Sequence, residues 1–446
     1  VISFDPVLAA TLRLPTTLLA NLMLVLLALT IVVSMQTVGV GLVAAMLVIY
    51  SLAYFQRTGI PGTIFDQLQH DFSLSATSVT ALGSVFVYVY AGMQLIVGIA
   101  ADSYGGRRTM LLGSTIMCVG AVLFPSAHTT SMLFVSRVLI GFGSSFIYLS
   151  IVKEIDTLFS ARHFAGLLGL VLLASYAGNI AATLPFERAV HRFGWRATLM
   201  AVAGLSCLSV AVAWAVLRQL PRMPTSHGRL PWRALAVVLR NGRSHGLLIC
   251  GMINFPITFV IQGVLGKKFL EDVAGLTSAG AATFLLIMAS VCGVAVGCSG
   301  LTLRLTGQRR KPVILFAVSM ILLSTLLLLV AVLTGAPGWV FLISYVLLAL
   351  SLAGSPPSLA TMKEVNRPDT VAVTIAVLNT VTYLCVGIVG NLSGLVLDLF
   401  ASRAAVAGER IVYPPAAYTT LFACLAALAF LSTLVTVFRN PETRGQ

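Results

Sequence analysis

Runs of about 20 apolar residues recur along the whole chain, and they restrict its fold more than any other feature. Each run can cross the roughly 30 Å hydrocarbon core of a bilayer as one helix. Of the 446 residues, 58% are hydrophobic and only 9% are charged, whereas soluble domains carry about 25% charged residues. No polar stretch is long enough for a separate soluble domain, so the sequence predicts an all-α membrane protein.

Short polar turns divide the apolar runs into about twelve predicted membrane-spanning helices. We place these helices at residues 38–56, 74–101, 108–126, 130–152, 162–185, 196–217, 245–266, 276–301, 311–334, 338–360, 368–396 and 416–438. They form two groups of six, at 38–217 and 245–438. A linker at 218–244 joins the groups, and a tail at 439–446 follows the second.

An additional apolar segment precedes the first of these helices. No charged residue occurs between Arg13 and Arg57. As one helix that stretch would be about 64 Å long, about twice what a bilayer needs. Gly39 and Gly41 offer a break, so we predict an extra hydrophobic segment at residues 1–37. A thirteenth span, a surface helix and a leader are all open for it.

The basic residues are unevenly shared between the two sets of alternating loops. Of 28 Lys and Arg, 18 lie in one set, which includes the linker and the C-terminus, and 8 lie in the other. The positive-inside rule places the first set in the cytoplasm, and the acid-free linker is expected to contact anionic lipid. The net charge of +14 therefore indicates orientation in a membrane, expected to be the bacterial inner membrane, and not nucleic-acid binding.

A tight charged turn at Gly98–Arg108 separates two of the apolar runs. Gly105 and Gly106 supply the backbone freedom that such a reversal needs. The spacing Gly-x3-Asp-x2-Gly-x-Arg-Arg resembles the loop between the second and third helices of the major facilitator superfamily. One position departs from the family pattern, because Ser103 stands where an arginine is usual.

An internal repeat indicates two halves of similar build. The segment Gly300–Arg310 matches Gly98–Arg108 at a constant offset of 202, with Arg304 in place of the aspartate. A second echo links Lys363-Glu364 to Lys153-Glu154 at an offset of 210. Two six-helix bundles related by pseudo-two-fold symmetry are typical of transporters that bind their solute between the halves at mid-membrane.

The resemblance also implies a gate at the cytoplasmic end. In the family the aspartate lies near the start of a helix from the other half, where unpaired amides favour an acid. The arginines meet acids at the end of the fourth helix. The predicted gating residues are Gly98, Asp102, Gly105, Arg107, Arg108, Glu154, Asp156, Arg304, Arg309 and Arg310.

The resemblance extends over most of the chain after residue 38. The pattern Arg137-x3-Gly141-x-Gly143 in the predicted fourth helix and Gly194-Trp195-Arg196 before the sixth are similar to further motifs of the superfamily. The Gly-Pro motif that many of its drug antiporters carry in the fifth helix is absent. Its absence weakens the interpretation as a drug exporter.

Arg137 is the only basic residue that we place inside a span, and no acid lies clearly within one. A buried arginine suits an anionic solute, because its guanidinium can bind a carboxylate or phosphate through two hydrogen bonds. The alternative is a structural role, in which Arg137 pairs with a carbonyl group or with an acid near the outer helix ends, namely Asp66, Glu187 or Asp398.

Further polar residues share helix faces within the apolar runs, where polar groups usually face a cavity or a partner. Tyr50, Tyr54 and Arg57, for example, lie on one face of the first core helix. The predicted substrate-binding residues are Arg137, Tyr50, Tyr54, Arg57, Gln94, Tyr148, Asn179, Asn254, Gln262, Asn379 and Tyr383. For each of them the alternative is a hydrogen bond between helices.

Nothing in the sequence indicates an enzyme or a cofactor. There is no His-x4-Asp acyltransfer pattern and no Gly-x4-Gly-Lys phosphate loop. The seven cysteines are scattered through apolar runs without a Cys-x-x-Cys pair, so we interpret them as small buried residues and not as metal ligands or disulfides.

The sequence thus predicts a secondary transporter that moves a small organic solute, favouring an anionic metabolite, by alternating access and with coupling to protons. Coupling through an outer acid such as Asp66 or Glu187, through the charge of the solute, or no coupling at all stays open. The alternatives are an exporter of drugs or metabolites and a non-transporting membrane sensor. We expect a monomer whose partners are the solute, membrane lipids and protons.

Overall fold

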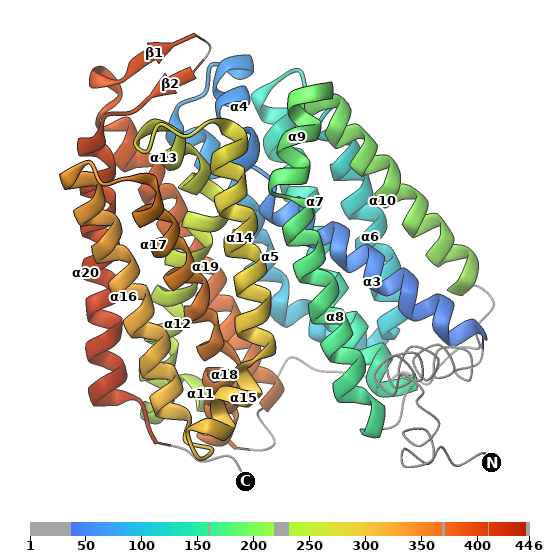
Figure 1. Ribbon diagram of the computed structural model, residues 1–446. Helices are drawn as coiled ribbons and strands as arrows, with labels where there is room; N and C mark the ends of the chain where they lie inside the picture. The colour runs from blue at the N-terminus through green and yellow to red at the C-terminus, as the bar shows by residue number, and fades with distance from the viewer. Residues whose placement is uncertain (1–36, 159–160, 218–231, 368–370, 409, 443–446) are drawn as a thin grey trace, which may run out of the picture.

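The computed structural model describes residues 37–158, 161–217, 232–367, 371–408 and 410–442 (Figure 1). Over these ranges the chain is almost entirely helical, and ten helical segments are long and apolar enough to cross a membrane. The predicted all-α membrane fold is therefore confirmed. The extra segment predicted at 1–37 lies outside the described residues, apart from Thr37, where α3 begins.

In its described residues, the N-terminal half has six long helices and three short segments. The long helices are α3 (Thr37–Thr58), α5 (Ala76–Tyr104), α6 (Gly106–Leu123), α7 (Thr130–Leu158), α8 (Ala161–Ala181) and α10 (Trp195–Leu217). The short segments are η1 (Gly62–Ile64), α4 (Phe65–Phe72) and α9 (Leu184–Phe193).

The C-terminal half repeats this plan, with two of its six helical rods interrupted. One rod runs α12 (Gly242–Val260), η2 (Ile261–Leu265) and α13 (Gly266–Asp272), and another runs α17 (Gly338–Leu350), η3 (Ser351–Gly354) and α18 (Ser355–Glu364). The others are α14 (Ser278–Gly297), α16 (Arg310–Thr334), α19 (Val371–Asp398) and α20 (Pro415–Arg439). The smaller elements are α11 (Trp232–Arg240), α15 (Ser299–Leu305), η5 (Ala401–Arg403), β1 (Ala405–Ala407) and β2 (Arg410–Val412).

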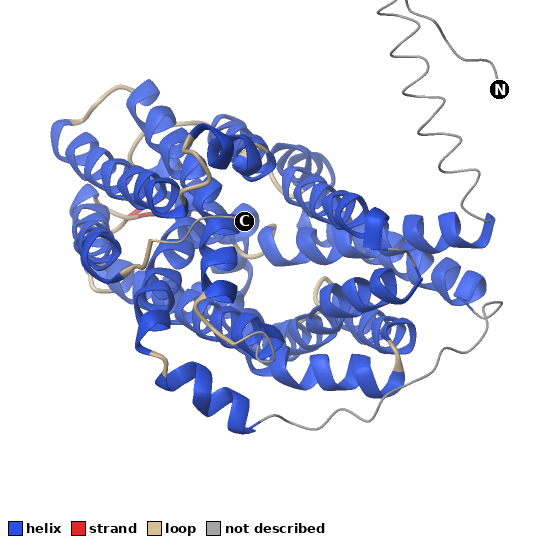
Figure 2. Cartoon of the chain, turned by 90° about the horizontal axis from the view of Figure 1, so that it is seen from below, coloured by secondary structure: helices blue, strands red, loops and turns tan. Residues whose placement is uncertain are grey.

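The two halves stand side by side as bundles, as Figure 2 shows from one end. Helix α5 packs along α19, and α8 packs against α14, so these two pairs form much of the boundary between the halves. Apolar side chains from both halves form one continuous buried core. The boundary between the halves is therefore packed by helices of both bundles.

The two ends of the molecule differ in structure (Figure 1). One end, called here the hairpin end, carries α4, α9, α13 and the antiparallel β1–β2 hairpin, in which Val406 pairs with Ile411. The opposite end, called the linker end, carries α11, α15 and α18. The predicted basic linker at 218–244 contains α11 and the start of α12, and its residues 218–231 lie outside the described part of the chain.

The repeated sequence segments occupy equivalent places at the linker end. Gly98–Arg108 spans the end of α5 and the start of α6, and Gly300–Arg310 spans α15 and the start of α16. The two segments differ in one respect, because α5 continues unbroken whereas α15 is separate from α14 at Cys298. The repeat thus reflects a real structural correspondence between the halves.

Two details depart from the sequence-based expectations. The seventh rod continues to Asp272, so Lys267 and Lys268, which we expected in a loop, lie in α13 and are buried. Acids four residues further on pair with both lysines, and this pairing lets the helix extend past them. All seven cysteines are free, but Cys298 and Cys424 are exposed and not buried as expected.

Arg137 of α7 holds the end of α3 in place. Its side chain is completely buried. Nη1 donates to the carbonyl oxygen of Gln56 at 2.9 Å, Nη2 to that of Ile60 at 3.2 Å, and Nε to that of Leu82 in α5 at 3.0 Å. Carbonyl groups at a helix C-terminus lack partners within the helix and attract a cation. The contacts of Arg137 therefore favour the structural alternative over a role in binding solute.

Replacing Arg137 with Met should destabilise the fold, because the methionine keeps the length but leaves the carbonyl groups of Gln56 and Ile60, at the end of α3, without a donor. Each unpaired buried group costs about 1–3 kcal/mol, so we expect a loss of at least about 2 kcal/mol in unfolding free energy. Thermal unfolding in detergent measures it, with Arg188→Met, at an exposed arginine of α9, as the control. Equal stability of Arg137→Met and the wild type would contradict this role.

Candidate functional site

A buried arginine lies at the boundary between the halves, but it is Arg57 and not Arg137. Arg57 sits in the last turn of α3, and only 6% of the residue is exposed. Its Nη1 donates a hydrogen bond of 3.0 Å to the hydroxyl of Tyr383 in α19, which belongs to the other half. Its Nε is buried and has no hydrogen-bond partner. The guanidinium therefore retains unused donor capacity at the contact between the two bundles.

Five aromatic rings surround the Arg57 guanidinium, and both halves contribute to them. The distances from Cζ to the ring centres are 4.6 Å for Tyr383, 5.1 Å for Tyr54, 5.2 Å for Phe259, 5.7 Å for Phe255 and 5.8 Å for Tyr90. Rings at such distances attract a cation through their negative faces. We call this set of five rings the aromatic cage.

No carboxylate pairs with Arg57 in the part of the chain that the structure describes. Moving a charge out of water costs several kcal/mol even after the protein relaxes, whereas one cation–π contact contributes about 0.5–2 kcal/mol. The aromatic cage and one hydroxyl thus offset only part of the free-energy cost of burying the Arg57 charge. The arrangement can accept an anion from outside the chain, and that anion would complete the neutralisation.

A cavity of about 200 Å³ opens next to the cage, within the C-terminal half. Phe255 and Tyr383 line both the cavity and the cage. Aliphatic side chains of α16 form one wall, and polar side chains of α12, α18 and α19 form another. Among the described residues, Ser355, Asn379 and Thr382 line it without a side-chain hydrogen bond to protein. Their free polar groups can bind hydroxyl or carbonyl groups of a solute.

The structure brings several of the predicted substrate-binding residues together. Tyr50 packs edge-on against Tyr54 at 5.4 Å between ring centres and stacks on Tyr148 at 5.6 Å. These rings continue the aromatic surface beside Arg57. Asn254 and Asn379 line the adjoining cavity, and Asn254 also accepts a hydrogen bond of 2.7 Å from Ser432.

Of the other predicted residues, Gln94 has one contact with this cluster, and Asn179 and Gln262 have none among the described contacts. Gln94 is buried one turn along α5 and bonds the carbonyl of Tyr90 at 3.5 Å. Asn179 Oδ1 and Gln262 Nε2 are buried without a partner among the described residues. Gln262 lies in the π-helical segment η2, a local geometry that is frequent at functional sites.

Three members of the aromatic cage were not predicted from the sequence, namely Tyr90, Phe255 and Phe259. A polar residue in an apolar helix stands out because its burial costs free energy. A phenylalanine there is ordinary, because its burial carries no such cost. Phe255 and Phe259 do share a helix face with Gln262, at spacings of four and three residues. That spacing is a usable signal, but only once the position of Arg57 is known.

At the linker end, the predicted gating residues make contacts that are similar in the two halves. The backbone N–H of Arg107, at the start of α6, donates to Glu154 Oε2 of α7 at 2.9 Å. At the equivalent place in the C-terminal half, Arg310 of α16 forms an ion pair with Glu364 of α18. The resemblance implied such a meeting of basic turns with acids at the end of the fourth helix.

The other predicted gating residues are placed by their backbones or by their exposure. Gly105 has φ of 83°, which a residue with a side chain rarely adopts. Arg108, Arg304 and Arg309 are exposed. Gly98 and Asp102 lie in α5 and Asp156 lies in α7. The side chains of the two aspartates are outside the described part of the structure.

Hydrogen bonds join the two halves at the hairpin end. The carboxylate of Asp398, the last residue of α19, accepts from the backbone N–H groups of Ala76 and Thr77 at 2.9 Å each, at the N-terminus of α5. Gln69 of α4 donates to the hydroxyl of Tyr413 at 3.2 Å. An acid on the helix N-terminus of the opposite half is favourable because of the unpaired amides there. These contacts hold the hairpin end closed.

Curated relatives match parts of the chain. It is 36% identical over 108 residues to the uncharacterised MFS-type transporter YwoD of Bacillus subtilis (24% of each chain). It is 28% identical over 102 residues to the probable sulfoacetate transporter SauU of Cupriavidus necator (23% of this chain, 24% of that one). It is 23% identical over 150 residues to the hexuronate transporter of Bacillus subtilis (34% of each chain). The chain thus spans about a quarter to a third of the length of these relatives.

Solved transporters share the fold over nearly the whole chain. The nucleoside transporter NupG superposes with a TM-score of 0.71 at 14% identity, covering 89% of this chain and 99% of NupG. A peptide transporter, POT, in complex with sulfate, gives 0.73 at 14% identity, covering 89% and 93%. The family model of the Major Facilitator Superfamily matches residues 46–390. The chain therefore belongs to the Major Facilitator Superfamily of transporters.

Proposed function

We propose that this protein transports a small organic anion by alternating access, and that Arg57 binds the anionic group of the solute. The observation that carries the proposal is a buried guanidinium between the two bundles, with an unpaired Nε and no acid partner among the described residues. Arg binds carboxylates and other oxyanions through two parallel hydrogen bonds. The protein is proposed to act as a monomer in the bacterial inner membrane.

The size of the cavity supports a small solute. Its volume of about 200 Å³ is below the range of about 300–1,000 Å³ that is usual for drug-sized ligands. The names of the sulfoacetate and hexuronate transporters refer to small organic anions. A sugar transport protein of Arabidopsis thaliana matches at a similar level, so these names are secondary to the geometry around Arg57.

Coupling to protons is part of the proposal. Carrying one negative charge into a cell against about 100 mV costs about 2.3 kcal/mol, and a proton moving with the anion removes this cost. Asp66, Glu271 and Asp272 are three acids that lie close together between the halves at the hairpin end. Either these acids or the solute itself would carry the proton.

The contacts at the linker end are proposed to support the inner gate, where the two bundles approach and separate during transport. Arg107 with Glu154 and Arg310 with Glu364 tie neighbouring helices within each half. Each pair therefore keeps its own bundle rigid while the two bundles rock against each other.

Replacing Arg57 with Gln should weaken anion binding by about 10- to 100-fold, because a hydrogen bond to a charged group contributes about 1.5–3 kcal/mol. Arg57→Lys keeps the charge but loses the forked geometry, so an intermediate loss is expected. Thermal-shift titration with a hexuronate, sulfoacetate and acetate measures the affinity. Arg192→Gln, at an exposed arginine of the same half, should bind like the wild type. Unchanged anion affinity in Arg57→Gln would exclude Arg57 as the site.

Proteoliposomes with an imposed pH gradient test coupling and direction. For the anion with the largest thermal shift, we expect accumulation when the outside is acidic, and loss of accumulation when a protonophore is added. Arg57→Gln liposomes should show only the background. Accumulation driven by the reverse gradient would instead indicate an antiporting exporter, and binding without any flux would indicate a sensor.

A further inference from the structure

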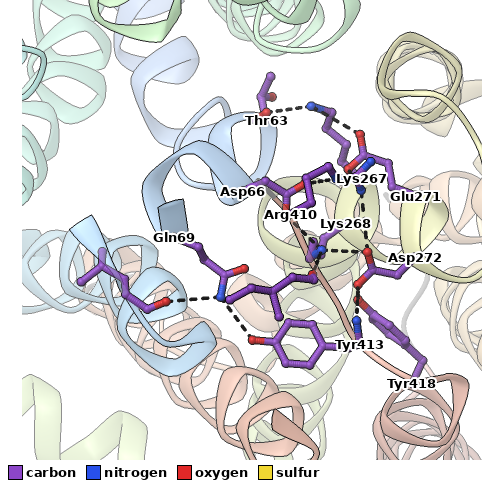
Figure 3. Close-up of polar contacts among 12 residues, drawn as sticks. Thr63, Asp66, Gln69, Lys267, Lys268, Glu271, Asp272, Arg410, Tyr413 and Tyr418 are labelled. Atoms are coloured by element: carbon purple, nitrogen blue, oxygen red, sulfur yellow. Dashed lines mark hydrogen bonds and ion pairs between the residues drawn. The ribbon is translucent and has the colours of Figure 1, made fainter. Parts of the chain in front are cut away.

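Six charged side chains from three separate elements meet at the hairpin end (Figure 3). Asp66 comes from α4 of the N-terminal half, and Arg410 comes from β2. The other four lie on α13, and they are Lys267, Lys268, Glu271 and Asp272. The proposed anion site at Arg57 does not include these residues, although three of them are the acids proposed above to carry a proton. In the sequence they are spread over about 340 positions.

The carboxylate of Asp66 is held by two cations of the opposite half. Its Oδ2 accepts from Arg410 Nε at 2.8 Å, and its Oδ1 lies 2.9 Å from Lys268 Nζ. The two oxygens thus have separate cationic partners, and contacts between charged groups of this kind are stronger than neutral hydrogen bonds. We call Lys268 and Arg410 the carboxylate cradle.

The cradle is built within the C-terminal half and does not depend on Asp66. Lys268 Nζ donates to Asp272 Oδ1 at 2.7 Å and also to the carbonyl of Ile411. Arg410 Nη2 donates to Glu271 Oε2 at 2.9 Å. Asp272 in turn accepts from the hydroxyl of Tyr418 at 2.8 Å. Both cations therefore keep partners in their own half when Asp66 moves away.

The charge balance of the C-terminal half requires an additional anion. Without Asp66, the three cations on α13 and β2 face two carboxylates, so the cluster carries a net charge of about +1. Burial lowers the pKa of Arg410, but the charges of Glu271, Asp66 and Asp272 raise it by more. The guanidinium consequently stays charged. Asp66 supplies the missing negative charge across the boundary between the halves.

A recess gives solution access to Arg410, one of the two cations of the cradle. A cavity of about 320 Å³ at the hairpin end is lined by Asp66, Lys267, Glu271 and Arg410 among others. Lys268 itself is completely buried, whereas 36% of the Arg410 side chain is exposed. The wall from the N-terminal half carries the acids Asp71 and Glu187, which repel an anion. An anion in the recess would therefore bind at the opposite wall, next to Arg410.

We propose that Lys268 and Arg410 form a second anion site, which Asp66 occupies while the hairpin end is closed and a carboxylate from solution occupies when it opens. Opening separates α4 from α13, which withdraws Asp66 and leaves the cradle unneutralised. A solute carboxylate that takes its place stabilises the open state. Asp66 thus acts as an internal stand-in for the solute. That the incoming carboxylate is the transported one rests on the proposed function; the binding itself does not.

Acetate binding to the purified full-length protein tests the cradle directly. Asp66→Ala removes the internal carboxylate and leaves room for one from solution, whereas Asp66→Asn fills the same space with a neutral amide. At equal ionic strength, replacing chloride with saturating acetate should raise the melting temperature of Asp66→Ala by about 2 °C more than it raises that of the wild type. This excess over the wild type, in which acetate binds only at Arg57, is the acetate effect of the cradle. Asp66→Asn should show no such excess.

Two double variants separate this site from Arg57. Adding Arg410→Gln to Asp66→Ala should abolish the acetate effect, because one cation of the cradle is lost. Adding Arg57→Gln should preserve it. An acetate effect that is equal in Asp66→Ala and Asp66→Asn, or that disappears with Arg57→Gln, would overturn the cradle. If the cradle shift persists while Arg57→Gln leaves metabolite binding unchanged, only the proposed function fails.

Discussion

A charge inside a membrane protein needs a partner, because the surroundings solvate it poorly. This constraint explains where the basic side chains of this chain lie. Arg137 uses three backbone carbonyl groups and joins α3, α5 and α7. Lys267 and Lys268 use acids one turn away on α13. Arg57 differs from all of these, because aromatic rings and one hydroxyl group surround it. The incomplete compensation at Arg57 is what makes an external anion favourable there.

The same constraint links the central site to the hairpin end. Asp66 and Asp398 each place a carboxylate on a positively polarised group of the opposite half, one on a lysine and an arginine and the other on a helix N-terminus. Opening this end exchanges these contacts for water or for a solute anion. In the proposed scheme, the difference in free energy between closed and open states depends in part on how well an anion replaces Asp66. Substrate binding and conformational change share one electrostatic basis in this scheme.

The sequence was sufficient for the helical rods and for the correspondence between halves, because spans of apolar residues and the Gly98–Arg108 repeat are local patterns. It was insufficient for distinguishing the surroundings of Arg57 from those of Arg137. Hydropathy gives the depth of a residue in the membrane but not the helices that it faces. The carbonyl groups that bind Arg137 come from α3, from the turn that follows α3 and from α5. The cradle depends on contacts between residues more than 140 positions apart, which no local pattern records. The ion pairs of α13 are visible in the sequence, because each acid follows its lysine by four residues.

The most direct test of the central claim is a crystal structure of the protein soaked with selenate, a small oxyanion that is visible by anomalous scattering. The account predicts a selenium peak about 4 Å from the Arg57 guanidinium carbon, with the oxyanion filling the unused donors. Selenium peaks confined to exposed basic residues, with Arg57 still unpaired inside its aromatic rings, would contradict it.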